Sequence, residues 1–312
     1  MRLGFDVGGT KTDGVVVTPA GEVVARLRRP TGWGGDAVVE TIVGLAHELA
    51  DAVGITASAV TSIGIGMPGQ VPGGGAIVTH AVNLGIEQLD LARTVGEALG
   101  VPVGAENDVK AAAVGASALH GDRGGVGRAM AYLNLGTGVA AGFVTDGRLW
   151  RGARGTAGEV GHISVDPRGP ECKCGQRGCI EAFSGGAAVA ERWGRPGALP
   201  VRDVFDAADA GDAAATALRD GLAYGVAAAV RVIVLATDVE TVILGGGVTA
   251  LGERLLSRVR ATLDAGAAAS PFMRSLRLSE RVELLPAGSP AAALGAALIG
   301  AAASEQEAVF HG

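Results

Sequence analysis

Hydrophobic and polar positions along the chain predict an alternation of strands and helices. Near the N-terminus, three short apolar runs at residues 3–7, 15–18 and 23–27 are separated by glycine-containing turns, which is typical of a β-meander. Residues 37–53 then carry apolar side chains at helical spacing until Gly54 ends the pattern. The first part of the chain therefore predicts a meander followed by a helix that covers it.

The same order recurs further along the chain. Residues 129–135, 139–145 and 148–150 form a second predicted meander, again with a glycine turn after its first strand. The other predicted helices are 91–99, 109–119, 213–236, 251–263 and 291–302, and the other predicted strands are 63–67, 101–103, 241–244 and 282–285. Two meanders, each followed by helices and strands, indicate a duplicated α/β unit. The glycine-rich residues 121–127 are the predicted hinge or linker.

Composition and charge narrow the class of protein. The chain has 312 residues, 48% hydrophobic and 19% charged, which predicts a globular protein long enough for two lobes. A net charge of −6 argues against a nucleic-acid partner or an anionic membrane surface. The longest apolar run, residues 222–236, contains Arg231 and is too short to cross a bilayer, and no export segment is visible. Three closely spaced cysteines suit a reducing, cytoplasmic compartment better than a disulfide framework.

A glycine turn between the first two strands has the composition of a phosphate-binding loop. In the sequence DVGGTKT, Gly8 and Gly9 allow the backbone to approach an anion and present its N–H groups. Thr10 adds a hydroxyl donor and Lys11 a compact positive charge, while Asp6 could hold Mg²⁺ directly or through water. The alternative is a β-hairpin whose glycines serve only the turn.

Two further glycine turns follow predicted strands. They are Gly136, Thr137 and Gly138 after one strand and Gly245, Gly246 and Gly247 after another. Three such turns at successive strand ends predict a nucleotide-binding site. The spaced ending of a Walker A loop and the dinucleotide-binding fingerprint are both missing from the first turn, so neither a P-loop enzyme nor a Rossmann enzyme is expected.

Carboxylates and one histidine are candidates for a polyhydroxylated ligand. Asn107 and Asp108 lie where a predicted strand gives way to a helix, a position where the helix dipole favours a carboxylate. Glu159, His162 and Glu181 lie in a segment that is otherwise poor in predicted structure. Carboxylates that accept several hydrogen bonds suit a sugar. The alternatives are that Asp108 only caps the helix and that the glutamates are ordinary surface residues.

A histidine and three cysteines have the spacing of a metal site. His162 is followed by Cys172, Cys174 and Cys179, and three thiolates with one imidazole complete a tetrahedral Zn²⁺ shell with no open position. The alternative is three reduced cysteines without a metal. Zinc is favoured because a loop this short has little core to hold it otherwise.

Taken together, these motifs resemble the ROK family (repressors, open reading frames and kinases). The matching segments are DVGGTKT at 6–12, GIGMPG at 64–69, NLG at 83–85, ENDVKAAAVGA at 106–116, LGTGVAAG at 135–142, GTAGEVGHISVDPRGPECKCGQRGCIEAFSGG at 155–186 and LGGGV at 244–248. They follow one another in order over nearly the whole chain. The resemblance implies an α/β protein with the actin-like ATPase fold, a duplicated ribonuclease-H-like fold with two lobes and a cleft between them. Residues 1–120 with 291–312 would form the small lobe and residues 121–290 the large lobe with the zinc loop.

The resemblance also implies roles for individual residues. Asp108 matches the catalytic base that takes the proton from the sugar hydroxyl as it attacks the γ-phosphate of ATP. The residues matching the sugar site are Gly69, Asn107, Asp108, Glu159, His162 and Glu181. Those matching the Mg²⁺-ATP motifs are Asp6, Gly8, Gly9, Thr10, Lys11, Gly136, Thr137, Gly138, Gly245, Gly246 and Gly247. Those matching the structural Zn²⁺ shell are His162, Cys172, Cys174 and Cys179. A homodimer or homotetramer is implied as well.

Three departures from the family pattern leave the sugar open. Lys110 stands where members often have Asn, Ala116 stands where many have Glu, and residues 73–75 are unusually glycine-rich. Glucose is the family's commonest substrate, but mannose, fructose, allose and N-acetylated hexosamines are handled by similar motifs. The family also contains repressors, which carry a helix-turn-helix before the phosphate motif; here that motif begins at Asp6, so no DNA-reading domain is expected. A non-catalytic sugar sensor is the other alternative, and Asp6, Lys11 and Asp108 argue against it.

Overall fold

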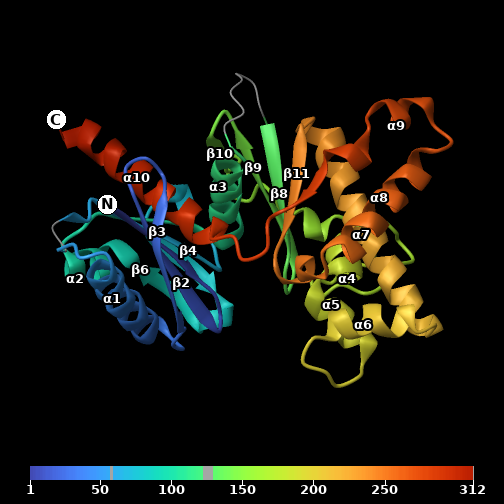
Figure 1. Cartoon of the computed structure of the whole chain (residues 1–312), viewed down its shortest axis with the longest axis horizontal. Helices are drawn as coiled ribbons and strands as arrows, with labels where there is room; N and C mark the ends of the chain where they lie inside the picture. Colours follow the sequence, from blue (N-terminus) through green and yellow to red (C-terminus); the bar gives the residue numbers. More distant parts are fainter. Residues whose placement is uncertain (57–58, 122–128, 312) are drawn as a thin grey trace. The chain divides into compact units, whose positions relative to one another are not determined.

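The structure is a computed structural model that describes residues 1–56, 59–121 and 129–311. It is a mixed α/β protein with two five-stranded sheets (Figure 1). The strands of the first sheet, in spatial order, are β3 (Val23–Pro30), β2 (Lys11–Val17), β1 (Arg2–Val7), β4 (Ser62–Met67) and β7 (Val103–Asn107). Those of the second sheet are β10 (Arg148–Trp150), β9 (Val139–Thr145), β8 (Ala129–Leu135), β11 (Thr241–Gly245) and β12 (Val282–Leu284).

The two sheets share one topology, which confirms the predicted duplication. In each, a three-stranded meander is extended by two strands that run parallel to its first strand. Parallel strands end at the same edge of a sheet, so residues that follow β1, β4 and β7 lie on one edge of the first sheet. A separate hairpin of β5 (Ile77–Ala81) and β6 (Ile86–Asp90) was not predicted.

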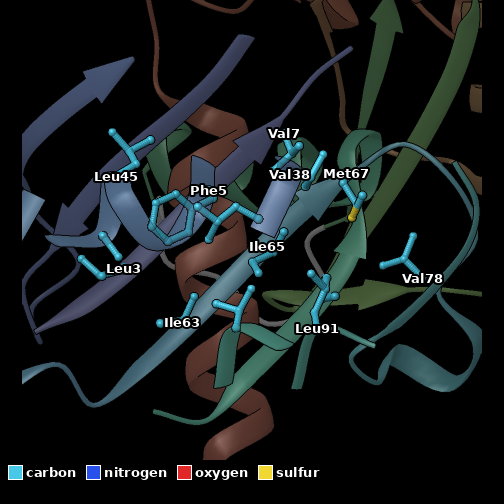
Figure 2. Close-up of a cluster of buried hydrophobic side chains, with 14 of the residues drawn as sticks. Leu3, Phe5, Val7, Val38, Leu45, Ile63, Ile65, Met67, Val78 and Leu91 are labelled. Atoms are coloured by element: carbon cyan, nitrogen blue, oxygen red, sulfur yellow. The ribbon is translucent and has the colours of Figure 1, made fainter. Parts of the chain in front are cut away.

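Helices cover both faces of the first sheet. On one face, α1 (Gly35–Ala52) places Leu45 in a core with Phe5, Ile63 and Ile65 of β1 and β4 (Figure 2). On the opposite face, α10 (Ala291–His311) packs against β1, β4 and β7, and α3 (Asp108–His120) packs against β4, β7 and α10. The apolar alternation along β1 and β4 thus points large side chains toward α1.

Glycines line the face that receives α10. Gly4 and Gly64 alternate with the large residues of β1 and β4, and a Cβ atom built on Gly64 would overlap the carbonyl oxygen of Ala296. Gly115 of α3 and Gly295 of α10 meet in the same way, each against the backbone of the partner helix. The absence of side chains lets α10 lie directly on strand backbone, a close approach that only glycine permits.

The remaining helices are α2 (Glu97–Leu99) after the hairpin and α4 (Ile180–Ser184), α5 (Gly186–Trp193), α6 (Pro200–Asp209), α7 (Ala213–Thr237), α8 (Glu253–Ala267) and α9 (Pro271–Ser275) in the second half of the chain. By length and composition α7 could cross a bilayer. Its 25 residues exceed the apolar run 222–236, which was predicted to be too short. Over half of its most apolar window, 56%, is buried inside the protein, and α7 packs against α4, α6 and α8. These contacts are those of a core helix.

The chain divides into two compact units. The first consists of Met1–Gly125, Gly142–Ala157 and Gly288–Gly312, and the second of Val126–Ala141 and Gly158–Ala287. The sequence-based division had placed residues 142–157 in the second lobe. They cluster with the first because Arg151 pairs with Glu106 of β7 and Lys110 of α3 donates to the carbonyl of Gly155.

Most predicted elements are present, with shifts at their ends. The second strand begins at Lys11, directly after the glycine turn, and not at residue 15. The strand predicted at 101–103 is Val103–Asn107, because pairing with β4 sets its register and carries it past Glu106. The helix predicted at 91–99 begins with a π-helical turn, Ala92–Gly96. The predicted linker at 121–127 lies, apart from Gly121, outside the described residues.

Candidate active site

Two carboxylates meet at the carboxyl edge of the first sheet. Asp6, the last residue but one of β1, pairs with Gly66 of β4, and Gly66 in turn pairs with Glu106 of β7. Asp108 begins α3 two residues later, and its Cα lies 3.7 Å from where a Cβ atom of Gly66 would stand. Because Gly66 has no side chain, Asp6 and Asp108 face the same space.

The environment of Asp6 fits a divalent cation. Burial, the negative charge of Asp108 and that of Asp13 raise the pKa of Asp6 to about 7, against the opposing effect of Lys11 and Arg26. The raised pKa shows that burial and the neighbouring carboxylates outweigh the positive charge of Lys11 and Arg26. Oxygen ligands in such surroundings suit Mg²⁺.

The predicted phosphate loop is the exposed turn between β1 and β2. The N–H of Gly8 donates to the carbonyl of Lys11 at 2.9 Å, and Gly9 lies beside the backbone of Asn83. Neither glycine is among the residues with positive φ, so the turn does not need glycine for its backbone conformation. A Cβ atom on Gly8 would lie 3.1 Å from the carbonyl oxygen of Lys11, so the hairpin favours glycine there, whereas one on Gly9 would meet only ordinary contacts.

Asn107 is the N-cap residue of α3. The side-chain oxygen of Asn107 accepts from the N–H groups of Val109 and Lys110 at 3.1 and 3.3 Å. Its amide nitrogen donates to the carbonyl of Gly69 at 3.2 Å, which ties the Pro-Gly loop to the helix start. One amide hydrogen of Asn107 remains for a ligand. Asp108 takes part in the same cap, because its Oδ1 accepts from the N–H of Val109 at 2.9 Å.

Sequence reasoning missed Arg151. The carboxylate of Glu106 is almost fully buried, with 2% of the side chain exposed, and accepts from Nε of Arg151 at 2.6 Å and from the N–H of Asn107 at 3.0 Å. The guanidinium also lies against Gly74, in the glycine-rich stretch singled out as unusual. A buried carboxylate needs a partner, but the predicted strand ended at residue 103, so the sequence did not show that Glu106 is buried.

In the second unit, the turn of Gly136, Thr137 and Gly138 contacts Glu181. The N–H of Val139, directly after the turn, donates to Oε2 of Glu181 at 2.9 Å. Glu159 and His162 lie on a loop that packs against β9, where the N–H of Ala141 donates to the carbonyl of Gly158 at 2.7 Å. The structure thus holds Glu159, His162 and Glu181 in the same unit.

The third glycine turn has both structural and unexplained members. A Cβ atom on Gly245 would overlap the ring of Tyr132, and one on Gly246, whose φ is 87°, would lie 2.6 Å from Leu135. These two glycines are required by packing. A Cβ atom on Gly247 would stand in open space, so packing does not require glycine at that position.

The cysteine cluster fits a tetrahedral zinc ion. One ligand atom from each of His162, Cys172, Cys174 and Cys179 can be chosen so that all four lie within 4.8 Å of one another. The sulfurs of Cys174 and Cys179 are 3.7 Å apart, close to the edge of about 3.8 Å of a tetrahedron with Zn–S bonds of about 2.3 Å. Nδ1 of His162 faces Cys172 at 4.0 Å, which leaves Nε2 on the other side of the ring.

The thiols of the cluster differ in environment. Burial raises the pKa of Cys179 to about 12, whereas hydrogen bonds from Gln176 lower the pKa of Cys174 to about 6. Without a metal, a buried protonated thiol would sit beside an ionised one. Zinc deprotonates its ligating thiols, so the donor set is the kind that a structural zinc ion completes.

The duplicated sheets and glycine turns define the actin-like ATPase fold. The ROK family model matches residues 2–302, and the chain belongs to the ROK family.

A glucokinase from Halalkalibacterium halodurans is 32% identical over 282 residues, 84% of this chain and 85% of that protein. An N-acetylmannosamine kinase from Yersinia pseudotuberculosis is 34% identical over 255 residues, 79% of this chain and 82% of that protein. The crystal structure of a ROK glucokinase from Streptomyces griseus with glucose and AMPPNP is 28% identical, covers 96% of this chain and 99% of its own, and has a TM-score of 0.76.

Proposed function

We propose that this protein is an ATP-dependent sugar kinase that transfers the γ-phosphate of ATP to a hydroxyl of a hexose. One observation carries the proposal: Asp108 faces Asp6 across Gly66, at the strand edge that also bears the exposed turn of Gly8 and Gly9. The proposed base, the proposed cation ligand and the proposed phosphate-binding turn are thus neighbours at one sheet edge. Relatives named as glucokinase and N-acetylmannosamine kinase support the same reaction class.

In the proposed reaction, Asp108 accepts the proton of the attacking sugar hydroxyl. Its position at the first residue of α3 keeps the carboxylate on a rigid element, where the helix N-terminus favours its ionised form. Asp6 would hold Mg²⁺, which neutralises charge on the phosphates when bound. The N–H of Gly9 and the side chain of Lys11 would bind the transferred phosphate, in a turn that the bond from Gly8 to Lys11 closes. Catalysis is then mostly positioning and charge neutralisation.

The proposed sugar ligands are Asn107, Glu159, His162 and Glu181, with Gly69 lining the site. Gly136, Thr137 and Gly138 would receive further ATP phosphates, and Gly245, Gly246 and Gly247 would lie on the adenosine side. Glucose, phosphorylated at its 6-hydroxyl, is the first candidate, because a relative at 32% identity is a glucokinase. N-acetylmannosamine is the second, because a relative at 34% identity phosphorylates that sugar by name.

The zinc ion is proposed as structural. It would fix the loop of His162, Cys172, Cys174 and Cys179 and hold the imidazole with Nε2 turned away from the metal. We also propose a cytoplasmic homodimer or homotetramer. The three unpaired cysteines support a reducing compartment.

The proposal is tested by ADP release with Mg-ATP across a panel of hexoses and N-acetylated hexosamines. The ranking of kcat/KM names the sugar. Asp108→Ala is expected to lower kcat about 10²–10⁴-fold while the Kd for sugar stays within a few-fold, because a general base acts on the chemical step. Retained turnover in Asp108→Ala would refute the base assignment. Binding of a hexose without turnover in the wild-type protein would favour a sugar sensor.

A further inference from the structure

Glu181 joins two parts of the second unit that are assigned to different substrates. It belongs to the short helix α4, which begins directly after the zinc ligand Cys179. Its Oε2 accepts a hydrogen bond from the N–H of Val139, the residue directly after the turn proposed to receive ATP phosphates. Its other oxygen, Oε1, has no hydrogen-bond partner among the described residues and stays available to a sugar hydroxyl.

The contact between α4 and the turn extends beyond one hydrogen bond. After α4, the N–H of Gly186 donates to the carbonyl of Gly136 at 2.9 Å, and the N–H of Ala187 donates to that of Thr137 at 3.0 Å. The carbonyl oxygens of the turn are therefore tied to the start of α5. The remaining side of the turn is held by the Glu181 carboxylate, which makes this side chain the adjustable part of the contact.

Glycines make room for the contact. A Cβ atom on Gly138 would overlap Oε2 of Glu181. One on Gly185 would lie 2.9 Å from the carbonyl oxygen of Glu181, and one on Gly186 would lie 2.8 Å from that of Gly136. Neither Gly138, Gly185 nor Gly186 has a positive φ, so turn geometry does not require them. Their absent side chains bring the carboxylate and the turn together.

We propose that Glu181 couples the two substrates energetically, with Oε2 holding the phosphate-binding turn and Oε1 binding a sugar hydroxyl. The inference rests on the proposed kinase function. A sugar bound at Oε1 fixes the rotamer of Glu181 and thereby orders the turn before the nucleotide arrives. Since that ordering cost is already met, the nucleotide binds more tightly, and by linkage the sugar binds more tightly in the presence of nucleotide.

The test measures binding, separately from turnover. Isothermal titration gives the Kd of Mg-AMPPNP without sugar and with saturating amounts of the hexose that has the highest kcat/KM. In the wild-type protein we expect the sugar to tighten nucleotide binding about 5-fold or more. In Glu181→Ala we expect weaker nucleotide binding and no effect of the sugar on it. Glu181→Gln, whose amide oxygen can still accept from Val139 while its NH₂ group meets the sugar, is expected to keep part of the effect.

Two further variants separate coupling from damage to the fold. Gly138→Ala breaks the contact between the carboxylate and the turn but keeps a glutamate at position 181. Nucleotide affinity should therefore fall, while the affinity for sugar in the absence of nucleotide is retained. Glu191→Gln, on the exposed end of α5, removes a glutamate outside the site and should behave as wild type. Zinc content and melting temperature report whether each variant is folded.

The outcomes are distinct. A wild-type sugar effect that survives in Glu181→Ala, or that is absent in a wild-type enzyme with hexose-dependent ADP release, overturns the coupling and leaves the kinase assignment standing. Absence of ADP release with every sugar contradicts the kinase assignment instead. Loss of the sugar effect in both Glu181→Ala and Gly138→Ala, with normal zinc content, supports the coupling.

Discussion

At the scale of single residues, the buried carboxylate of Asp6 lowers the stability of the folded protein when it is ionised. Its pKa is raised to about 7, chiefly by burial, so the folded protein holds a proton that the unfolded chain releases near the ordinary pKa of 3.8. The folded state therefore binds more protons than the unfolded state between about pH 4 and 7. In that window stability falls as the pH rises, and above pH 7 the full cost of the buried charge is present. Such a loss of stability is typical of a residue that serves ligand binding and not folding.

Asp6→Asn is accordingly expected to stabilise the nucleotide-free protein at pH 8 by a few degrees in melting temperature and to have little effect at pH 4. The measurement is the melting temperature of both proteins across this pH range in magnesium-free buffer. Added Mg²⁺ should narrow the difference at pH 8, because it binds only the carboxylate. The same variant should lose Mg-ATP-dependent turnover. A difference in stability that does not vary with pH would contradict the raised pKa.

At the scale of elements, the zinc loop acts through helix α4. Cys179 is the last ligand of the cluster and α4 starts at the next residue, with Ile180 donating its N–H to the carbonyl of Ile163. Metal binding at the proposed zinc site would thus fix the start of the helix that carries Glu181. His162, at the other end of the loop, is held by the same cluster.

Cys174→Ser tests this role. Cys174 is the exposed ligand of the cluster, so its replacement creates no cavity, yet it should abolish stoichiometric zinc. We expect sugar affinity to fall at least about 10-fold, as is typical when the support of a site is loosened. Zinc is measured by release to a chromophoric chelator and sugar affinity by titration. Normal sugar binding in a zinc-free protein would show that the loop holds its shape without metal.

The sequence predicted elements better than it predicted their connections. Strands with strong apolar patterns, such as β8 and β9, begin and end where the pattern places them, because burial on both sides leaves one register. The predicted range of β7 ended too early, because the charged Glu106 argues against a buried strand. The ion pair with Arg151 is what allows Glu106 to be buried. Similarly, the three cysteines and His162 were visible as a cluster from spacing, whereas the bond from Val139 to Glu181 joins residues 42 positions apart that no local pattern relates.

At the scale of the whole molecule, the chain leaves the first unit and returns to it at its end. Residues of α10 complete the core begun by β1 and β4, and the glycines of those strands receive that helix. The first unit therefore depends on a contact between residues more than two hundred positions apart. The residues proposed to bind zinc belong to the second unit.

Gly64→Ala is the variant that separates the stabilities of the two units. Its Cβ atom would overlap the carbonyl oxygen of Ala296, and a backbone group cannot move away as a flexible side chain can. We expect a loss of at least about 3 kcal/mol in the first unit, since overpacking against backbone forces α10 off the sheet. Hydrogen exchange should accelerate in β1, β4 and α10 but not in α7 or the zinc loop.

Gly44→Ala, at an exposed site of α1 with open space, is the matched control and should be neutral or stabilising by up to about 1 kcal/mol. Equal acceleration throughout the chain would show that the two units unfold as one.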